Sequence, residues 1–446
     1  MKKKQGFSLG TILTLCLTVT VIVGCIFLFG KIRGQNSDVR MDAQRVLGAM
    51  GSMIQSSTDA PNPQATVRTV TVTLAPVSVA PTTAAPSLPS TSPAPVTATA
   101  NTASPQRYAF SLTAGGLLKF DSDISDSVYD KQQKSLDYRL IVSPLSPKVF
   151  ADMNLITLPQ VINSADLKYA DTLVPTQAAD AIRSLGVDQV ILGTEHVLDQ
   201  GAPGAGDTVT ALSSRGLIST GVNMGSASQN RIVPLNGDKI AVLSYTDALT
   251  ARGKNALKNQ SGLLNEFDLE TARQDILSAK AQGARCVIVC VYWGKPDAVS
   301  VTASQKNIAR SLAEMGADVI LGARPSRVLP MEKITTLGPE GKSRDTFVAY
   351  SLGTLLSESR EGYDISGILL HLNITCDEQG QVRVDSAEYT PTYIWRQTVD
   401  KKIQYRVVCS ADPAPDNMSD QQKEVMSRAL NRIQNTLKDS PVSQRR

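Results

Sequence analysis

One short segment of this sequence holds side chains that can bind metals and transfer protons. Glu195, His196 and Asp199 lie within it. Carboxylates and imidazoles are common ligands of divalent metals and common general acids and bases. The spacing leaves two interpretations open: a single weak catalytic or metal site, or a loop in which His196 and Asp199 hydrogen-bond to each other. We favour the second.

A second group combines cationic, aromatic and hydroxyl side chains from two segments. Its members are Tyr292, Trp293, Lys295, Arg324, Ser326 and Arg327. Cations beside aromatic faces suit carboxylate, phosphate or sugar ligands. The group therefore predicts a cleft for an anionic ligand. The alternatives are that the cations are solvated loop residues and that Trp293, which follows an apolar run, belongs to the core.

Several other kinds of chemistry are excluded by composition and motif. The chain has 446 residues and only two histidines, and the second, His371, lies in an apolar run expected to be a buried strand. No phosphate-binding glycine loop, paired zinc cysteines or nucleophile elbow is present. A net charge of +4, with basic residues spread thinly, gives no patch for nucleic acid. We expect no cofactor and no nucleic-acid partner.

The elements that must position these side chains lie between residues 106 and 412. Short apolar runs typical of strands alternate there with helical segments that each end at a glycine. We expect strands at 108–113, 189–192, 239–245, 286–292 and 318–321. Helices are expected at 178–185, 209–214, 269–282 and 303–315. Gly115-Gly116 and the glycine-rich segment 201–206 are expected to form turns.

Later apolar runs have no helices between them. They lie at 346–352, 367–373 and 381–389, which predicts an antiparallel part that completes a second sheet. The sequence therefore predicts a mixed α/β fold with two sheets. Residues 419–437 have the pattern of an amphipathic helix that packs on the domain, or alternatively on a partner or membrane, and the tail 439–446 is expected to fray.

The N-terminal part predicts a membrane anchor. Residues 7–30 carry no charge, and a helix of that length spans about 36 Å, enough to cross a hydrocarbon core of about 30 Å. We expect a cytoplasmic tail at 1–6, one transmembrane helix at 7–30, a juxtamembrane segment at 31–54 and an extracytoplasmic domain. Basic residues on both sides of the helix weaken this orientation. Lipidation at Cys25 is an alternative to the helix.

Residues 55–105 are rich in Pro, Thr, Ala and Ser. They offer too little apolar surface to offset the entropy of ordering, so a disordered stalk is expected. The six cysteines do not indicate a disulfide framework. Cys286 and Cys290 are too far apart on a strand to bridge, whereas a bond between Cys376 and Cys409 is left open.

The order of motifs over residues 110–391 resembles the capsule-synthesis CapA family, a branch of the calcineurin-like metallophosphoesterase fold. The family's GD dipeptide corresponds to Gly115-Gly116, and its NLE motif to Thr157-Leu158-Pro159. Its NNHxxDxG loop corresponds to the segment that begins Thr194-Glu195-His196 and continues to Asp199 and Gly201.

Three further motifs of the resemblance follow the later strands. HWGxE corresponds to Tyr292-Trp293-Gly294-Lys295-Pro296, and GxHPH to Gly322-Ala323-Arg324-Pro325-Ser326. YSLGN corresponds to Tyr350-Ser351-Leu352-Gly353-Thr354. The resemblance implies a two-sheet sandwich flanked by helices, of metallophosphoesterase type, with these segments at the strand ends.

Most positions that coordinate metal in such a site are replaced in this chain. Glycine and proline offer no side-chain ligand, and arginine brings a permanent positive charge; the replacing residues are Gly116, Pro159, Tyr292, Arg324 and Ser326. The resemblance therefore implies a membrane-anchored, non-catalytic protein of capsule or envelope polymer synthesis, retention or export, whose cationic cleft binds an anionic envelope polymer. The alternatives are an active metal-dependent hydrolase or ligase-associated enzyme that uses Glu195, His196 and Asp199, and an interaction module in an envelope assembly.

Overall fold

The computed structural model describes residues 107–163, 169–224, 231–337, 341–359 and 364–445, together with Gly362. These residues fall in one compact unit, Ala98–Arg446. The predicted tail, transmembrane helix, juxtamembrane segment and stalk, residues 1–105, lie outside the described residues. Within the described ranges, no helix combines the length and the apolar character needed to cross a membrane.

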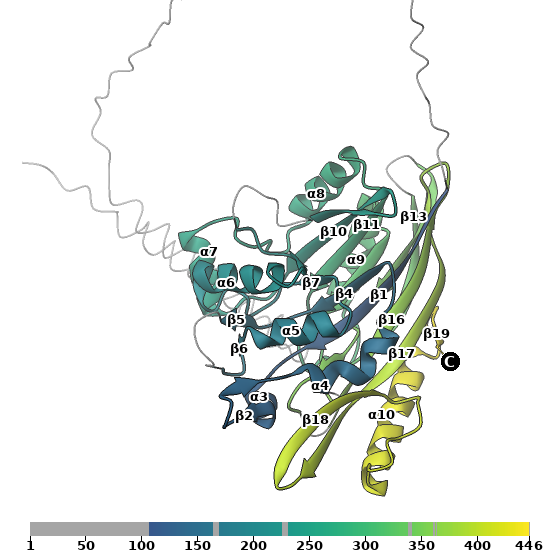
Figure 1. Cartoon of the computed structure of the whole chain (residues 1–446). Coiled ribbons are helices and arrows are strands. Elements are labelled where there is room, and N and C mark those ends of the chain that lie inside the picture. Colours follow the sequence, from purple (N-terminus) through teal and green to yellow (C-terminus); the bar gives the residue numbers. More distant parts are fainter. Residues whose placement is uncertain are drawn as a thin grey trace, which may run out of the picture. The chain divides into compact units, whose positions relative to one another are not determined.

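The larger sheet of the described residues has nine strands (Figure 1). Seven of them run in the order β18-β17-β16-β1-β4-β7-β8, while β15 pairs with β1 and β19 pairs with β17. β1 is antiparallel to β16 and parallel to β4. Their bounds are β1 Tyr108–Leu118, β4 Met153–Thr157, β7 Gln189–Ile191, β8 Ile218–Thr220, β15 Thr354–Leu356, β16 Ser366–Cys376, β17 Val382–Val399, β18 Lys402–Cys409 and β19 Ser443–Gln444.

The second sheet has six strands in the order β13-β14-β12-β11-β10-β9. The central strands β10, β11, β12 and β14 pair in parallel, whereas the edge strands β9 and β13 pair antiparallel with their neighbours. The bounds are β9 Arg231–Leu235, β10 Asp238–Thr246, β11 Cys286–Tyr292, β12 Val319–Ala323, β13 Met331–Leu337 and β14 Ser343–Ala349. Two short pairs lie outside both sheets: β2 Tyr129–Asp130 with β3 Ser135–Leu136, and β5 Val161–Asn163 with β6 Leu173–Pro175.

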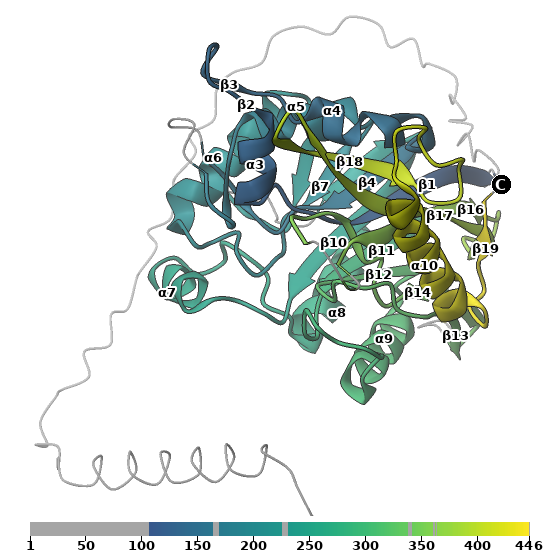
Figure 2. The ribbon, with the colours of Figure 1, turned by 90° about the horizontal axis from the view of Figure 1, so that it is seen from below.

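The helices cover the outer faces of the two sheets (Figure 2). Those beside the nine-stranded sheet are α3 Ser122–Val128, α4 Arg139–Val142, which continues into a 3-10 turn at Ser143–Lys148, α5 Gln177–Ser184 and α6 Gly201–Ser213. Those beside the six-stranded sheet are α8 Leu269–Ala281 and α9 Ala303–Met315. The short α7 is Ala251–Asn259, and α10 is Asp420–Leu437. The order of layers is helices, sheet, sheet, helices.

Side-chain alternation along the strands accounts for this layering. In β11 the side chains of Cys286, Ile288 and Cys290 face the nine-stranded sheet, while those between them pack under α8 and α9. Every residue of β11 is therefore buried, which is why its sequence is continuously apolar. The predicted two-sheet α/β architecture is confirmed.

Predicted elements with local signals agree closely with the structure. The strand at 286–292 and the helix at 303–315 have the predicted bounds. Thr302 and Gln305 form a capping box at the start of α9, and Gly316 ends it with a φ of 113°. α10 begins with the same device at Ser419 and Gln422 and packs on the sheet through buried Met426, Ala429 and Ile433.

Two predicted turns are wrong, and in both the glycines serve close packing. Gly115 and Gly116 lie inside β1, where the strand passes against Leu355 and the backbone of Gly353. The segment 201–206 is the first half of α6. A β-carbon at Gly204 would overlap the side chain of Gln200, just before the helix, and lie 3.2 Å from Val161, so glycine also lets the helix lie against β5.

Two long-range pairings also differ from expectation. The strand expected at 346–352 belongs to the six-stranded sheet as β14, whereas β16 and β17 join β1 in the other sheet. The tail at 439–445 is not frayed, because β19 pairs with β17.

Cys376 and Cys409 are both free and buried, as are Cys286 and Cys290.

His371 is buried in β16, as predicted, between two threonines. Its Nδ1 lies 3.1 Å from Thr113 Oγ1 and its Nε2 lies 3.0 Å from Thr390 Oγ1. Burial, and then the positive charges of Arg445 and Lys148, lower the pKa of His371 from 6.5 to about 4. The imidazole is therefore neutral in the folded protein at neutral pH.

This environment predicts a pH dependence of stability. Between pH 6.5 and 4 the unfolded chain binds a proton at His371 that the folded chain does not, so stability is complete above pH 6.5 and falls as the pH is lowered. The loss reaches about 3 kcal/mol near pH 4. Urea unfolding should show that the free energy of unfolding falls less between pH 7 and pH 5 for His371→Gln than for the unmodified protein. Equal declines would contradict the prediction.

Candidate functional site

The carboxyl ends of the parallel strands bring the motif segments together, as expected for loops at one edge of packed sheets. β7 leads into the segment at Glu195, β11 into the segment at Gly294, and β12 into Arg324. Hydrogen bonds join these segments directly. Ser326 N donates to Pro296 O at 2.8 Å, and Trp293 Nε1 donates to Tyr350 O at 3.0 Å.

An ion pair between Arg324 and Glu195 links the loops of the two sheets. Arg324 Nε lies 3.1 Å from Glu195 Oε2, and Nη2 lies 3.3 Å from Oε1. The third nitrogen, Nη1, donates to the carbonyl oxygen of Gly294. The side chains are 17% and 23% exposed. This is the paired geometry in which guanidinium–carboxylate contacts are strongest.

Arg324 has an unusual backbone conformation for a residue with a side chain. Its φ is 98°, in a region that glycine adopts readily and other residues rarely do. Such conformations persist where surrounding contacts impose them, and they are concentrated at functional sites. The three hydrogen bonds of the guanidinium supply such contacts here.

Asp247 belongs to the same cluster and was not among the predicted residues. It follows β10, and its Oδ2 accepts a hydrogen bond from Gly294 N at 3.2 Å. The side chain of Asp247 reaches solvent, but partial desolvation by the surrounding protein raises its pKa, and the negative charge of Glu195 raises it further. The hydrogen bond from Gly294 and the positive charge of Arg324 lower the pKa and oppose this shift. A carboxylate directly after a buried strand was the signal that could have identified it.

His196 and Asp199 hydrogen-bond within their own loop. His196 Nδ1 donates to Asp199 Oδ2 at 2.8 Å, and Thr250 Oγ1 donates to Asp199 Oδ1. Thr250 also caps α7 by accepting from Gly253 N at 3.0 Å. The carboxylate of Asp199 therefore orients the imidazole and supports the start of α7. His196 remains 31% exposed at its side chain.

The predicted ligand-binding residues divide into buried and accessible ones. Tyr292 and Ser326 are 6% and 9% exposed, and Trp293 is fully buried. The Trp293 ring stacks on Tyr350 with ring centroids 5.8 Å apart. Burial, and then the negative charge of Glu195, raises the pKa of Tyr292. Lys295 is exposed and Arg327 is partly exposed.

The residues at the strand ends do not fit the two metal ions that the resemblance implies. Within the described ranges, no three His, Cys, Asp or Glu side chains are placed to hold a metal. The guanidinium of Arg324, beside Glu195 and Asp247, would repel a cation. At Gly116 a β-carbon would overlap the carbonyl oxygen of Gly353 and lie 2.8 Å from its carbon, so an aspartate could not stand there without a backbone shift.

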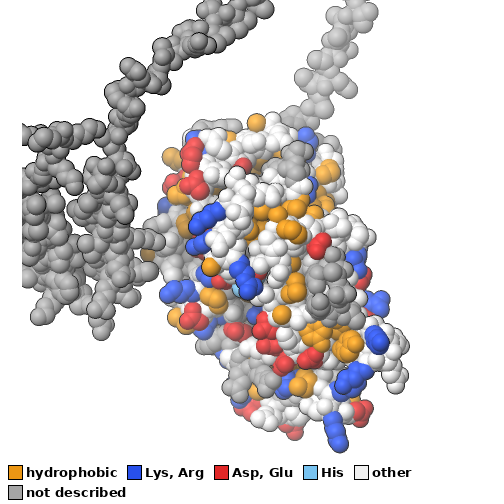
Figure 3. Space-filling model, turned by 90° about the vertical axis from the view of Figure 1, so that its left-hand side faces the viewer, with side chains coloured by type: hydrophobic (Ala, Val, Ile, Leu, Met, Phe, Trp, Pro, Cys, Tyr) orange, Lys and Arg blue, Asp and Glu red, His pale blue; other side chains and the backbone are white. Residues whose placement is uncertain are grey.

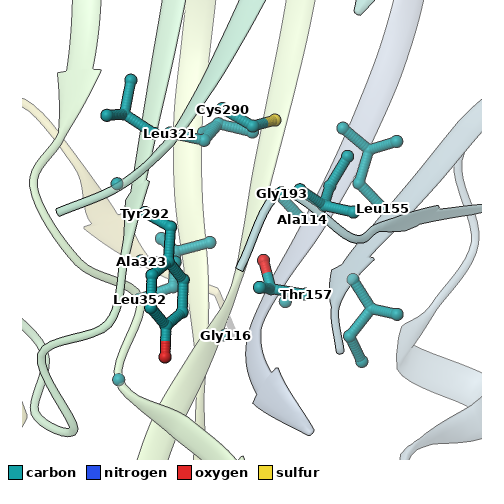
Figure 4. A pocket seen from close by; sticks show the side chains of 16 residues that line it. Ala114, Gly116, Leu155, Thr157, Gly193, Cys290, Tyr292, Leu321, Ala323 and Leu352 are labelled. Atoms are coloured by element: carbon teal, nitrogen blue, oxygen red, sulfur yellow. The ribbon is translucent and has the colours of Figure 1, made fainter. Parts of the chain in front are cut away.

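The cavity beneath these loops is also small. Figure 4 shows Cys290, Leu321 and Tyr292 on one side and Ala114, Leu155 and Thr157 on the other. Its volume is about 20 Å³, room for about one water molecule. A substrate group larger than a water molecule therefore does not fit inside it.

Comparison with known proteins places this geometry in a family. A model of the bacterial capsule synthesis protein PGA_cap matches residues 111–359. The chain belongs to the PGA_cap family. This confirms the resemblance to capsule-synthesis proteins and covers the strand-end segments described above.

Two curated relatives of this PGA_cap protein come from Bacillus. The capsule biosynthesis protein CapA of Bacillus anthracis is 29% identical over 154 residues, 33% of this chain and 37% of that protein. The PGA biosynthesis protein CapA of Bacillus subtilis strain 168 is 26% identical over 213 residues, 46% of this chain and 53% of that protein. The match therefore spans about half or less of each relative.

Solved structures similar to this PGA_cap protein include a nucleotidase and a calcineurin-like phosphoesterase. The NAD nucleotidase NadN of Haemophilus influenzae has a TM-score of 0.40 and 13% identity, covering 76% of this chain and 64% of that one. The calcineurin-like phosphoesterase YfkN of Bacillus subtilis has a TM-score of 0.34 and 14% identity, covering 75% and 99%.

The close contact between Gly116 and the backbone of Gly353 can be tested by substitution. Gly116→Ala forces the backbones of β1 and Gly353 apart, so we expect a loss of about 1–3 kcal/mol in the free energy of unfolding. Urea titration followed by tryptophan fluorescence measures it. Gly253→Ala is the control, because its β-carbon meets only contacts of 3.4 Å or more and alanine favours the helix. Equal stability of Gly116→Ala and the unmodified chain would contradict this account.

Proposed function

We propose that this PGA_cap protein is a membrane-anchored, non-catalytic member of its family that binds an anionic surface polymer during capsule or envelope synthesis, retention or export. The observation that carries the non-catalytic part is the Arg324–Glu195 ion pair. It stands where the resemblance implies metal ligands, and a fixed cation there excludes a second one. Without metals, the phosphoesterase type of hydrolysis has neither its nucleophile nor its charge stabilisation.

The anionic ligand is supported by two accessible cations at the strand ends. Lys295 lies on the loop after β11 and Arg327 on the loop after β12, and the 2.8 Å hydrogen bond from Ser326 to Pro296 holds these loops together. The names of the two relatives, for capsule biosynthesis and PGA biosynthesis, agree with a polymer such as poly-gamma-glutamate.

Charge elsewhere does not suggest a broad attracting field. On the face drawn in Figure 3, acidic and basic side chains are interspersed. In the cluster itself Arg324 is neutralised by Glu195. A polymer would therefore be held by local contacts to Lys295 and Arg327, and its binding should weaken with salt.

The anchor is proposed from sequence. Residues 7–30 have the length and composition of a transmembrane helix, and residues 55–105 those of a spacer. We propose a single-pass protein of the cell membrane whose domain faces outward, with envelope assembly proteins as further partners.

A metal-dependent hydrolase is the second candidate, because one observation favours it. Asp199 orients the imidazole of His196 through Nδ1, and the side chain keeps 31% of its surface exposed. This is the arrangement in which a carboxylate supports a general acid or base. Glu195, however, is engaged by Arg324.

Metal content separates the two candidates. Elemental analysis of the purified full-length protein, followed by titration with Mn²⁺ and Zn²⁺, should find no stoichiometric ion and no thermal shift. One or two tightly bound ions per chain would contradict the non-catalytic proposal and support the hydrolase.

Polymer binding tests the ligand. Full-length protein in detergent should bind immobilised poly-gamma-glutamate, and Lys295→Glu with Arg327→Glu should weaken binding about tenfold or more, since two charge-assisted contacts are reversed. Lys402→Glu, an exposed lysine on β18, is the matched control and should bind normally. Equal binding by all three proteins would exclude the strand-end loops as the site and favour an interaction module in an envelope assembly.

A further inference from the structure

Arg324 occupies the point where loops from both sheets meet. Glu195 follows β7 of the nine-stranded sheet, whereas Gly294 follows β11 and Arg324 follows β12 of the six-stranded sheet. The guanidinium contacts both other residues, and Gly294 in turn donates to Asp247, which follows β10. Four strand ends are thus joined through one side chain and its neighbours.

The bonding capacity of the guanidinium matches this linking position. Three of its nitrogens donate to Glu195 and Gly294, which uses three of its five N–H groups. The carboxylate of Asp247 is also close enough for Arg324 to lower its pKa against the effect of burial. One positive charge therefore binds the carboxylate of Glu195 and the carbonyl oxygen of Gly294 and attracts the carboxylate of Asp247. Carboxylate and carbonyl oxygens are also the ligands that a hard divalent metal takes.

Backbone and burial both indicate that this contact is built into the fold. The φ of 98° at Arg324 is unfavourable for any residue but glycine and is compensated only if the side chain makes its contacts. With 17% and 23% exposure, the pair is screened by solvent far less than the surface pairs of the chain. The ion pair Arg428–Glu424 on α10, for example, is 56% and 67% exposed.

We infer that the guanidinium of Arg324 is the resident cation of this site and takes over the structural role of metal ions in holding the strand-end loops together. The protein then needs no divalent metal to keep these loops closed. The inference concerns the structure of the loops and does not depend on which polymer, if any, binds to them.

Arg324→Gly tests the inference, because glycine accepts the φ of 98° without strain while the side chain that carries the cation and its hydrogen bonds is removed. We expect the Tm of the full-length protein to fall by about 3 °C or more. Amide hydrogen exchange in residues 194–201 and 294–301 should become about tenfold faster. Millimolar methylguanidinium should restore part of both losses, because it replaces the missing group.

Arg215→Ala is the matched control. Arg215 binds Asp180 with the same two-nitrogen geometry, at 2.7 and 3.0 Å, between α5 and the end of α6. Its loss should accelerate exchange only around that contact and leave the strand-end loops unchanged. Glu195→Gln keeps the shape of the partner but removes its charge. It should also accelerate exchange in residues 194–201 and 294–301, though less than tenfold, and it replaces Arg324→Gly as the test if the glycine variant does not fold.

Two results would overturn the inference. One is an unchanged Tm with unchanged loop exchange in both Arg324→Gly and Glu195→Gln. The other is a fall in the Tm of the unmodified protein in EDTA that Mn²⁺ or Zn²⁺ reverses, since the loops would then be held by metal. If the unmodified protein bound no polymer but Arg324→Gly still accelerated loop exchange, the proposed function would be wrong and this inference would stand.

Discussion

The face-to-face packing of the two sheets determines where everything else in this domain lies. Side chains of β1 and β16 from one sheet and of β10, β11 and β12 from the other form a continuous apolar layer. Because the strands are buried on both faces, helices must cover the outer sides, and the connections are confined to the strand ends. The segments that carry polar side chains therefore meet at one edge.

At that edge the same packing leaves little free space. Glycines let backbones touch where side chains would separate them, as Gly116 does against Gly353 and Gly322 does against Tyr350. The polar groups that remain are satisfied mainly by one another: Arg324 by Glu195, His196 by Asp199, and Asp199 by Thr250. Most polar side chains at this edge are therefore paired with one another, and the exposed ones lie at its rim.

Local sequence signals predicted the parts of the fold that local interactions determine. The strand β11 and the helix α9 were predicted with their observed bounds because apolar runs, a capping box and a terminal glycine lie within the segments themselves. The glycines of β1 and α6 were interpreted as turns because their packing partners are far away in the chain. Sheet membership of β14 and β16 likewise depends on pairing that no local pattern specifies.

The candidate site was predicted in composition but not in connectivity. The loop bond between His196 and Asp199 spans three residues and was inferred from spacing. The pair formed by Arg324 and Glu195 joins residues 129 apart, so Arg324 was interpreted as a ligand-binding candidate and Glu195 as a candidate only in the alternative of a weak catalytic or metal site. Asp247 was missed because it belongs to no motif of the resemblance, although its position after β10 places it at the same edge.

The contact between Gly116 and Gly353 limits which substitutions this domain can accept. Because the backbones of these two residues are in contact, a single substitution cannot place a carboxylate at residue 116: the new side chain has no room until the neighbouring strand end has moved. Replacing Arg324 alone would leave Glu195 without its partner. Single substitutions that would introduce metal ligands at this edge therefore pass through a less stable protein.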